Sequence, residues 1–564
     1  MKDSYIYAAD FETTTDASDC RVWAWCCTNI NEPDNCTIGT SIESFNKHVN
    51  KLGSVIIYFH NLKFDGMFLL DYWLRRGYIH RTDKELNDNE FSTLISDSGQ
   101  WYAMKQRIKS NIVEYRDSLK IIPIPIEEFS KTFNIPEQKL EINYSEFRCV
   151  NHELTEAEIN YIKSDTIILA KALKIMISRG FNRLTCGSNA YYNYKSMTPG
   201  FSKLFPVLAQ YVDRDIRKSY KGGWTYLNKE YRNKKVFSGE VYDVNSMYPW
   251  AMKYCALPYG NPVRFSGEYK KSEIYNLYVV EIECEFKLKK GKFPSIQIKN
   301  SIFYSETEYI EESEDITTLI LTSVDLELFF ECYDVNIYKW CGGYAFKSKV
   351  GLFSDYIDYW YNIKSQSKID GNKGYEFIAK RMLNSLYGKY GSRGEGRSKI
   401  PYLDDGVVRF KLSELENRKA GYVPVASFIT SYCRDKIIRA ANSIGSRFIY
   451  ADTDSIHILA GEKPNIDIDE YRLGAFKLES RFIRAKFIRQ KTYMEIDDCV
   501  DVNGNHIELK NIKCAGMPKK IQKRVDEIDF CEGSVFNGKL LPEVVPGGVI
   551  LKETTFEIKG SKKS

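Results

Sequence analysis

Apolar residues recur along the first 180 positions in patterns that predict both strands and helices. Three short runs alternate or are continuously apolar, as in strands, at residues 4–12, 21–28 and 54–59. Stretches of helical periodicity follow at 67–77 and 153–180, and the second ends on Gly180. Strands followed by covering helices predict an α/β domain that extends to about residue 185.

The remaining chain is a less regular mixture of strands and helices. A polar stretch at 185–196 is the expected linker between the two parts. The pattern then predicts a strand that turns into a short helix at 240–260, β-rich structure at 265–350, a helix at 377–391, a turn-rich insertion at 392–406 and a strand–turn–strand at 446–461.

The composition is that of a globular protein with more than one core. The chain has 564 residues, whereas single cores stop growing near about 250–300. Its 43% hydrophobic and 27% charged residues exclude a mainly disordered or fibrous chain. We expect no membrane partner and no signal peptide, because no apolar run reaches about 18 residues and residues 1–12 contain no apolar signal stretch. Dispersed Cys and His residues disfavour a disulfide framework, structural zinc and histidine chemistry.

Charge is unevenly distributed, although the net charge is only +5. The acidic run at 305–315 predicts a solvated loop, because like charges repel and stay hydrated. Two basic runs, at 472–491 and 509–524, interleave cations with apolar and aromatic residues. A solvated amphipathic face explains such runs, but so does a surface that follows phosphates, and we favour nucleic acid as the partner.

Four carboxylates in three fragments form the first candidate site. Asp10 and Glu12 lie two apart on a predicted strand and therefore share a face, although an isolated pair of this kind is usually just an exposed strand. Asp65 follows a buried-looking strand, and Tyr161 and Asp165 share a helical face. Together they match a two-metal site for phosphodiester hydrolysis, with oxygen ligands that suit Mg²⁺ or Mn²⁺.

A second carboxylate set lies in the later part of the chain. Asp243 ends a predicted strand, and the next residue, Val244, can add its backbone carbonyl as a ligand. Asp452 and Asp454 occupy the turn of the predicted strand–turn–strand, where a DxD sequence alone is usually just a turn. Combined with Asp243, they match two metals that clamp an attacking and a leaving oxygen.

A polar stripe on one predicted helix accompanies this second set. Lys380, Asn384 and Tyr387 are spaced four and three apart, so they line one helical face. The stripe offers a cation for phosphate and an aromatic ring for a base or sugar. A surface helix with chance polarity is the alternative.

These fragments resemble, in order, the motifs of family B DNA polymerases. DFE, NLKFD and YIKSD are similar to the exonuclease motifs, DVNSMYP, KRMLNSLYG and YADTDS to the polymerase motifs, and KTY at 491–493 to the KxY motif. YKGG at 220–223, the long segments between the polymerase motifs and the ending KCAGMPKKI…VPGGVIL resemble the protein-primed branch, the replicative polymerases of small tailed bacteriophages with linear, protein-capped genomes. The resemblance covers essentially the whole chain.

The resemblance implies a fold and domain boundaries. An RNase H-like α/β exonuclease domain at 1–185 would precede an α+β right-hand polymerase domain at 186–564 with palm, fingers and thumb. Within the second domain we expect the following parts: a first insertion at about 255–350 contacting the terminal protein, fingers at 351–390, a second insertion at 391–425 closing around the DNA, palm at 426–480 and thumb side at 481–564.

It also implies roles for individual residues. The exonuclease metals would be bound by Asp10, Glu12, Asp65 and Asp165, with Tyr161 orienting the water. Contacts to the single-stranded primer end and other DNA would come from Thr13, His60, Asn61, Phe64, Phe68, Ser118, Leu119, Lys139, Tyr144, Tyr220, Gly222, Gly223, Lys491 and Tyr493. The polymerase metals would be held by Asp243, the Val244 carbonyl and Asp454, with Asp452 in support. The nucleotide would be contacted by Ser246, Tyr248, Lys364, Lys380, Asn384 and Tyr387.

The resemblance leaves the roles of two sites undecided. The segment before Lys380 is longer than the family pattern, so either Lys364 or Lys368 takes the phosphate role. Glu141 is a weaker candidate for a further metal contact.

The function implied is replicative DNA synthesis that starts from a terminal-protein hydroxyl, displaces the opposing strand and is proofread by a 3′–5′ exonuclease. We expect DNA, dNTPs and a terminal protein as partners, Mg²⁺ as cofactor with Mn²⁺ as a substitute, a monomer, and the cytoplasm of a bacterial host. The alternatives are a DNA-primed repair polymerase and a non-catalytic DNA-binding scaffold. A reverse transcriptase is disfavoured because the turn reads DTD rather than two adjacent Asp.

Overall fold

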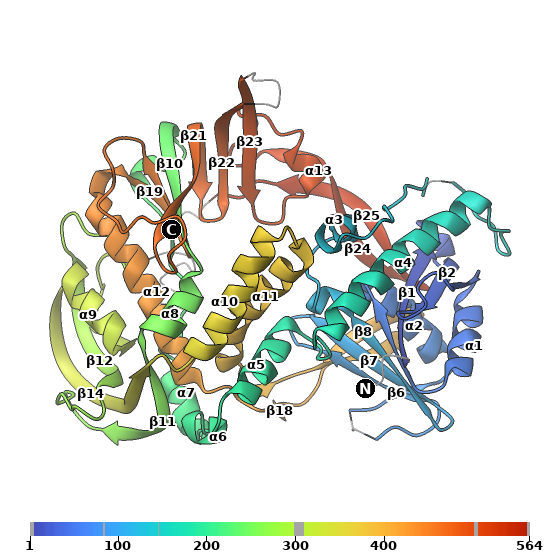
Figure 1. The fold of residues 1–564 in the computed structure, drawn as a ribbon, viewed down its shortest axis with the longest axis horizontal. Helices are drawn as coiled ribbons and strands as arrows, with labels where there is room; N and C mark the ends of the chain where they lie inside the picture. The colour runs from blue at the N-terminus through green and yellow to red at the C-terminus, as the bar shows by residue number, and fades with distance from the viewer. Residues whose placement is uncertain (1–4, 83–84, 145, 298–308, 501–505, 561–564) are drawn as a thin grey trace.

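The computed structural model has two lobes joined by several bridging segments (Figure 1). It describes residues 5–560 apart from 83–84, 145, 298–308 and 501–505. The first lobe contains the N-terminal third of the chain, and the second contains most of the rest. In the described ranges, no helix combines the length and apolar character needed to cross a membrane.

The first lobe is built on an eight-stranded sheet of order β3-β2-β1-β4-β8-β7-β6-β5. Strand β1 (Ile6–Thr13) pairs antiparallel with β2 (Val22–Asn29) and parallel with β4 (Val55–Phe59), which is itself parallel to β8 (Asn111–Asp117). The predicted α/β character of this part is confirmed. The other strands are β3 (Thr37–Gly39), β5 (Ile79–His80), β6 (Glu90–Ile95) and β7 (Trp101–Ile108).

Helices cover both faces of this sheet. Helix α2 (Leu62–Arg75) and helix α1 (Ile42–Leu52) pack with Phe45, Phe59 and Trp73 in one apolar cluster. Helix α4 (Glu156–Ser178) packs on β1 and β2, and its Thr155 cap accepts the N–H of Glu158 while Glu158 accepts the N–H of Thr155. A short helix, α3 (Phe129–Phe133), precedes it.

The segment expected to be a linker is a helix, so that prediction is wrong. Helix α5 (Cys186–Met197) starts with the Thr185 hydroxyl accepting the N–H of Ser188. Cys186, Ala190 and Tyr194 are buried four residues apart, which gives the helix an apolar stripe. It packs on α11 (Lys373–Tyr390) and therefore belongs to the core of the second lobe rather than to a flexible connection.

The second lobe is centred on a seven-stranded sheet of order β23-β22-β21-β10-β20-β19-β9. The predicted strand–helix at 240–260 is confirmed as β10 (Lys235–Val244) followed by α8 (Met247–Tyr254). The predicted strand–turn–strand is confirmed as β19 (Phe448–Asp452) and β20 (Ser455–Leu459). The remaining strands are β9 (Thr225–Leu227), β21 (Phe476–Arg489), β22 (Thr492–Val500) and β23 (His506–Cys514). The expected boundary at 480/481 falls inside β21.

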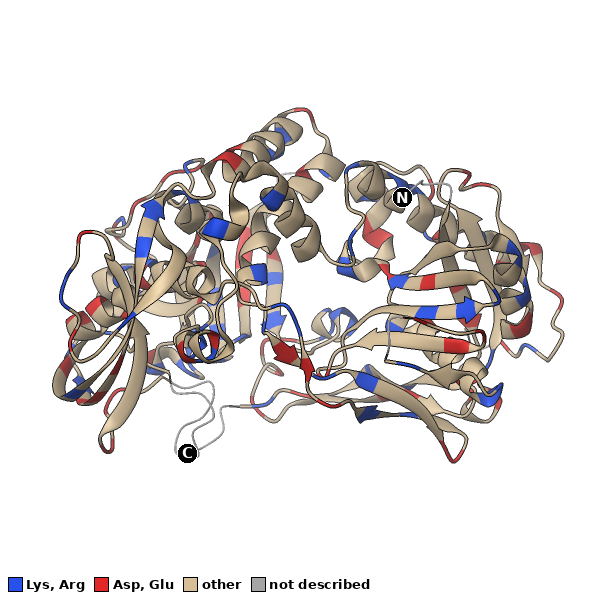
Figure 2. Cartoon of the chain, turned by 90° about the horizontal axis from the view of Figure 1, so that it is seen from below, with Lys and Arg blue, Asp and Glu red and all other residues tan. Residues whose placement is uncertain are grey.

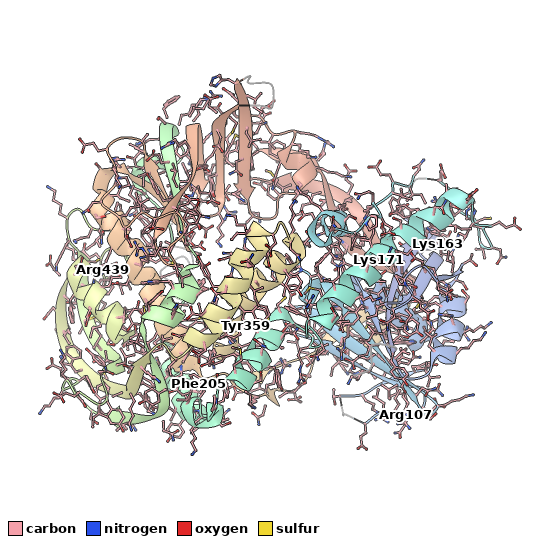
Figure 3. All side chains as sticks on the ribbon, viewed as in Figure 1. Arg107, Lys163, Lys171, Phe205, Tyr359 and Arg439 are labelled. Carbon is pink, nitrogen blue, oxygen red and sulfur yellow. The ribbon has the colours of Figure 1, made fainter. Side chains whose placement is uncertain are left out.

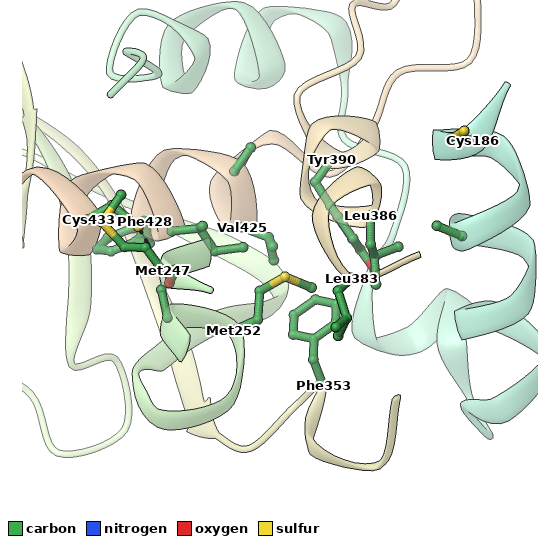
Figure 4. Packing of buried hydrophobic residues seen from close by; sticks show 14 of the residues in the cluster. Cys186, Met247, Met252, Phe353, Leu383, Leu386, Tyr390, Val425, Phe428 and Cys433 are labelled. Atoms are coloured by element: carbon green, nitrogen blue, oxygen red, sulfur yellow. Dashed lines mark hydrogen bonds between the residues drawn. The ribbon is translucent and has the colours of Figure 1, made fainter. Parts of the chain in front are cut away.

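Three helices form the apolar core beside this sheet (Figure 4). Helix α12 (Val423–Ile444) contributes Val425 and Phe428, and α8 contributes Met247 and Met252. Leu383 and Leu386 of α11 meet them from the other side. Helix α10 (Ser354–Ile369) packs along α11, which continues through Gly388 rather than ending at it. Two shorter helices, α6 (Phe201–Leu204) and α7 (Gln210–Arg217), precede the sheet.

The β-rich segment at 265–350 is confirmed as part of a separate four-stranded sheet of order β11-β14-β12-β13. Its elements are β11 (Ala256–Phe265), β12 (Leu277–Leu288), β13 (Thr317–Thr322), helix α9 (Ser323–Cys332) and β14 (Tyr333–Val350). Part of the acidic run lies outside the described residues. Of its described part, Glu312 and Glu314 are exposed, whereas Ile310 is buried.

Two hairpins from the second half of the chain reach the first lobe (Figure 1). The first is β16 (Lys399–Asp404) with β17 (Val407–Leu412), flanked by the short strands β15 (Glu395–Gly396) and β18 (Glu416–Asn417). The second is β24 (Val535–Val545) with β25 (Gly548–Glu557), which follows helix α13 (Lys519–Gln522). Both pack on α2, and they also contact each other.

Candidate functional sites

The first carboxylate set gathers beside the C-terminal half of β1, an interior strand of the N-terminal sheet. Asp10 and Glu12 lie on β1, Asp65 lies in the first turn of α2, and Asp165 lies on α4 one turn after Tyr161. Glu12, Asp65 and Asp165 are all buried. Three elements distant in sequence thus bring together the four acids that the sequence grouped by their order alone.

A strained turn before α2 aims Asp65. Asn61 has a left-handed backbone with φ of 75°, a conformation that Asn adopts more readily than most residues. One oxygen of Asp117, at the end of β8, accepts the N–H of Asn61 at 3.1 Å and that of Leu119 at 3.0 Å. Asp117 therefore holds Asn61 and Leu119, two predicted DNA contacts, close to each other.

Burial raises the pKa values of all four acids, and other carboxylates of the set add to the shifts of Asp10, Glu12 and Asp65. Burial, followed by the charge of Asp165, raises the pKa of Asp10 to about 7. Burial and the neighbouring carboxylates hold the pKa values of Glu12 and Asp65 well above their usual range. Lys139 opposes the shifts of Asp10, Glu12 and Asp165, and its Nζ lies 3.5 Å from Asp165. One lysine cannot neutralise four carboxylates, so the site lacks positive charge.

Contacts to α4 fix the position of Lys139. Lys171, labelled on this helix in Figure 3, pairs with Glu137. The Ser164 hydroxyl donates to the Gln138 carbonyl at 2.8 Å. Tyr144, farther along the same loop and 47% exposed, lies with its hydroxyl 2.7 Å from that of Tyr161. Lys139 and Tyr144, which are predicted to contact a DNA strand, thus lie beside the acids.

Four residues expected to touch a DNA strand are buried, namely Thr13, Phe68, Ser118 and Tyr493. Phe68 is 2% exposed and lies under Gly548 of β25, so the expectation of a direct contact does not match its position. Ser118 is fully buried, and its hydroxyl lies 2.9 Å from Nδ1 of His60. Its position supports orientation of the partly exposed His60 rather than a contact of its own.

The second carboxylate set converges where β10 and β19 end and β20 begins. Asp243 at the end of β10 is in register with Ser455 of β20, directly after the Asp452–Asp454 turn. The N–H of Val244 donates to the Asp454 carbonyl at 2.8 Å. This bond closes the turn onto the strand, so Asp243 and Asp454 are held side by side.

The predicted YxGG segment supports that turn. The N–H of Thr453, whose φ is 67°, donates to the Trp224 carbonyl at 2.9 Å. A Cβ on Gly223 would lie 2.7 Å from the Thr453 side chain, which is too close for a side chain there. Arg434 on α12 donates to the carbonyls of Lys221 and Gly222. Gly223 thus allows this segment to pack against the turn.

The second set lines a cavity of about 890 Å³. Asp243, Asp452 and Asp454 share its wall with Lys491 and Tyr493, the predicted primer contacts. Lys491 Nζ lies 3.5 Å from Asp452. A cavity that combines acids with a cation and an aromatic ring matches a site for a polyanion held through metal ions.

The two basic runs contribute to this cavity only in part. Lys513 and Lys519 line it, but Arg481 pairs with Glu240, and Arg484 pairs with Glu508 and Glu527. Lys and Arg residues are spread over both lobes (Figure 2). Contact of the runs with nucleic acid stays a prediction.

Glu479 is a member of this site that the sequence analysis missed. It lines the cavity. Burial, then the charges of Asp454 and Glu479, raises the pKa of Asp243 to about 7. Pairing of β10 with β21 shifts between Val241–Ser480 and Tyr242–Leu478, so Glu479 is the extra residue of a β-bulge. A bulge of this kind depends on strand pairing, and no motif in the sequence indicated it.

The predicted nucleotide contacts lie on three helices beside the cavity. The rings of Tyr248 and Tyr387 stack at 4.0 Å between centroids and 10° between planes. Lys364 Nζ is 3.5 Å from the Ser246 hydroxyl. Burial, then the charges of Lys380 and Lys477, lowers the pKa of Lys364. Lys364 therefore lies in a cluster of cations to which the exposed Lys368 also contributes, and the choice between Lys364 and Lys368 for the phosphate role stays a prediction. Lys477 is a member of the cluster that sequence reasoning missed.

Both acid sets fit a divalent cation in their chemistry. Oxygen donors predominate, and the Oδ1 atom of Asp165 is buried without a hydrogen-bond partner among the described residues. Among the residues that the structure describes, no three His, Cys, Asp or Glu side chains are placed so that they could hold a metal ion as they stand.

The family of the chain follows from comparison with known proteins. Residues 49–473 match the model of DNA polymerase type B, organellar and viral, so the chain belongs to this family and is a DNA-directed DNA polymerase. It is 41% identical to the DNA polymerase of Bacillus phage M2, over 98% of this chain and 99% of the relative. The polymerase of Bacillus phage phi29 is also 41% identical over the same shares, and that of Streptococcus phage Cp-1 is 33% identical over 98% of each chain.

Solved structures agree with these relatives. The chain is similar to phi29 DNA polymerase complexed with primer-template DNA and incoming nucleotide substrates, with a TM-score of 0.93 and 39% identity over 98% of this chain and 100% of that chain. The same polymerase complexed with single-stranded DNA gives a TM-score of 0.92 with the same coverage. The family uses divalent metal, and the polymerase assignment rules out the alternative of a non-catalytic scaffold.

Proposed function

We propose that this polymerase replicates a phage-type linear genome, starting on the hydroxyl of a terminal protein and proofreading its own product. The main supporting observation is that one chain holds two separate acid sets, a buried one in the first lobe and a half-buried one lining a cavity in the second. The chain also matches phage polymerases over 98% of its length. We assign palm, fingers and thumb to the seven-stranded sheet, the α10–α11 pair and the C-terminal hairpin. The chain would act as a monomer in the cytoplasm of the bacterial host.

In synthesis, Asp243, Asp454 and the Val244 carbonyl would hold Mg²⁺, with Asp452 and Glu479 shaping the field around them. When bound, the ions would lower the pKa of the attacking hydroxyl and neutralise the triphosphate. Lys364, Lys380 and Lys477 supply the remaining positive charge for the phosphates. Tyr248, held by its stack on Tyr387, would sit where a ribose 2′-hydroxyl would clash.

In proofreading, Asp10, Glu12, Asp65 and Asp165 would hold Mg²⁺ for hydrolysis, and Tyr161 would orient the attacking water. Lys139 and Tyr144 lie at the edge of the acid set, where they can hold the phosphate and base of a single strand. A mispaired end frays at lower cost than a matched one and so enters this site more often. Stacking on an exposed ring contributes about 1–3 kcal/mol per base.

Two folded insertions support the protein-primed branch of the proposal. The four-stranded sheet with α9 stands apart from the seven-stranded sheet, as a contact surface for terminal protein requires. The β16–β17 hairpin packs on α2, and its Val408 is buried in the core of the first lobe. With β24–β25 it forms a connection between the lobes, which favours retention of DNA and separation of strands ahead of synthesis.

The deciding experiment supplies Mg²⁺, one labelled dNTP and the separately encoded candidate terminal protein. Covalent label on that protein in a denaturing gel is the expected result. Extension of DNA primers without such label would favour the DNA-primed repair polymerase instead.

Two variants test the assignment of the acid sets. Asp454→Ala should abolish nucleotide addition and leave single-strand degradation intact. Asp10→Ala with Glu12→Ala should do the opposite. Normal synthesis by Asp454→Ala would contradict the polymerase assignment.

A further inference from the structure

A buried hydrogen bond joins two strands that are not neighbours. His457 Nδ1 on β20 lies 2.6 Å from Glu495 Oε1 on β22, and both side chains are 2% exposed. Strands β10 and β21 lie between them in the sheet. Three inter-strand spacings correspond to roughly 14 Å in a flat sheet, so the contact requires the sheet to curl.

The curl is built into the two intervening strands. Gly239 on β10 faces the ring of Phe482 on β21 at a distance that leaves no room for a Cβ. On the concave side, the His457 ring is surrounded by Tyr450, Phe487 and Tyr493, with centroids 5.2, 5.7 and 5.1 Å away. The pair is therefore enclosed by aromatic packing and has little freedom to adopt another arrangement.

Each end of the pair adjoins a different part of the polymerase site. His457 lies three residues after Asp454 on the same hairpin, and Glu495 lies two residues after Tyr493 on the same strand face. The N–H of Lys491 donates to the Tyr450 hydroxyl at 3.0 Å. All of these groups except Tyr450 line the cavity of the second acid set.

Stability alone does not account for a buried polar pair at this place. A buried carboxylate and imidazole are costly unless they are paired, and apolar residues of similar size often stabilise as well or better. His457 Nε2 is also buried with no hydrogen-bond partner in the described ranges, so the ring is held by Nδ1 alone. What the pair provides is a defined distance between two strands.

We infer that His457 and Glu495 are positioning residues that hold the primer-gripping strand at a set distance from the polymerase carboxylates. The inference rests on the proposed roles of Lys491 and Tyr493 in gripping the primer and of Asp454 in metal binding. Without the pair, β22 and the Asp452–Asp454 turn would move relative to each other. The primer end would then leave the polymerase site more often and reach the exonuclease site.

The test uses the full chain and a matched primer–template. It measures the dNTP concentration at which extension overtakes excision. Glu495→Leu and His457→Leu should raise that concentration roughly tenfold or more, because small displacements of reacting groups are costly. Glu495→Gln should keep this dNTP concentration near the wild-type value, because the amide oxygen of Gln can accept the same hydrogen bond from His457. Degradation of single-stranded DNA should stay within about twofold in every variant.

Two further variants separate positioning from folding. The double variant His457→Leu with Glu495→Leu replaces the pair by apolar residues, so it should keep the wild-type Tm and still show the raised dNTP requirement. Glu240→Leu breaks the 3.0 Å pair with Arg481 between adjacent strands of the same sheet and should leave the dNTP requirement unchanged.

Three results would overturn the inference. One is a stably folded double variant that extends primers like the wild type. Another is an equal loss in Glu240→Leu, which would show general loosening of the sheet. The third is a wild-type chain that extends no primer, and this result alone would also overturn the proposed function.

Discussion

At the scale of single residues, both acid sets concentrate negative charge that the neighbouring lysines neutralise only in part. Asp10 and Asp243 are each raised in pKa to about 7, first by burial and then by neighbouring carboxylates. A carboxyl that binds its proton more tightly when folded stabilises the folded state at low pH. That stabilisation is lost as pH rises from the unfolded pKa near 3.8 through the folded value near 7.

The first prediction concerns metal removal and pH. In EDTA, the Tm should fall between pH 5 and pH 8, because the buried acids must then ionise beside one another. Mg²⁺ binds the ionised form, so it should raise the Tm more at pH 8 than at pH 5. Thermal unfolding with and without Mg²⁺ measures both effects. Asp10→Asn with Asp243→Asn should weaken the dependence of Tm on pH in EDTA. An equal Mg²⁺ effect on Tm at pH 5 and pH 8 would contradict the prediction.

The second prediction concerns the close packing behind the polymerase turn. Gly223→Ala should lower nucleotide addition by about tenfold, because its Cβ would push Thr453 and move Asp452 and Asp454. Gly222→Ala should cost less, since nothing lies within 4 Å of its Cβ position among the described residues. Single-nucleotide insertion measures both, and single-strand degradation is the control for folding. Equal losses in the two variants would argue against the steric mechanism.

Residue types and order in the sequence predicted most of the acids but not their neighbours. Asp10, Glu12, Asp65 and Asp165 converge as their motif order predicted. Glu479 enters through a β-bulge, and Glu495 reaches His457 only because the sheet curls. Phe68 was assigned to DNA by resemblance, whereas the fold covers it with β25. Such features depend on strand pairing and curvature, which local sequence patterns do not encode.

At the scale of elements, local pattern predicted the elements whose hydrophobic period was strong. Helix α4 and the β19–β20 hairpin lie where periodicity placed them. Helix α5 was missed because its Gly, Ser and Asn content reads as a loop, while its narrow apolar stripe is satisfied only by packing on α11. The order of strands in the sheets, with β10 between β20 and β21, involves contacts hundreds of residues apart and was beyond sequence reasoning.

The third prediction concerns the β16–β17 hairpin. The chain can be rejoined after removal of the hairpin, because Ser398 and Ser413 lie side by side at its base. The N–H of Ser413 donates to the Ser398 carbonyl at 2.8 Å. Deleting 399–412 should lower synthesis through a duplex by roughly tenfold or more, because DNA is then no longer enclosed between the lobes. Copying of a single-stranded template over a few nucleotides should be retained.

The same deletion exposes part of the first lobe, which supplies its control. Val408 and Phe410 pack on the core near Trp101, so the Tm should fall. Val408→Ala keeps the hairpin but removes part of this apolar contact. It should lower Tm without the loss in duplex synthesis. Equal loss in both variants would assign the effect to stability rather than to enclosure.

At the scale of the whole molecule, the C-terminal hairpin closes the connection between the lobes. The N–H of Gly547 at its tip donates to Asp71 of α2 at 3.1 Å. Val545, Val549 and Ile550 join the apolar cluster of the first lobe. The chain thus returns from its far end to its beginning, and the two acid sets lie in lobes tied together on more than one side.

The last prediction tests whether that closure retains DNA. Gly548→Val should undock the hairpin, because a side chain there would collide with the ring of Phe68. Product length per binding event, measured with a trap for dissociated enzyme, should fall roughly tenfold, since tethering acts through effective concentration. Gly538→Val lies on the same hairpin with φ of 103° and open space around its Cβ among the described residues, so it carries backbone strain without the collision. If Gly538→Val shortens products equally, strain in the hairpin rather than docking on the first lobe controls retention.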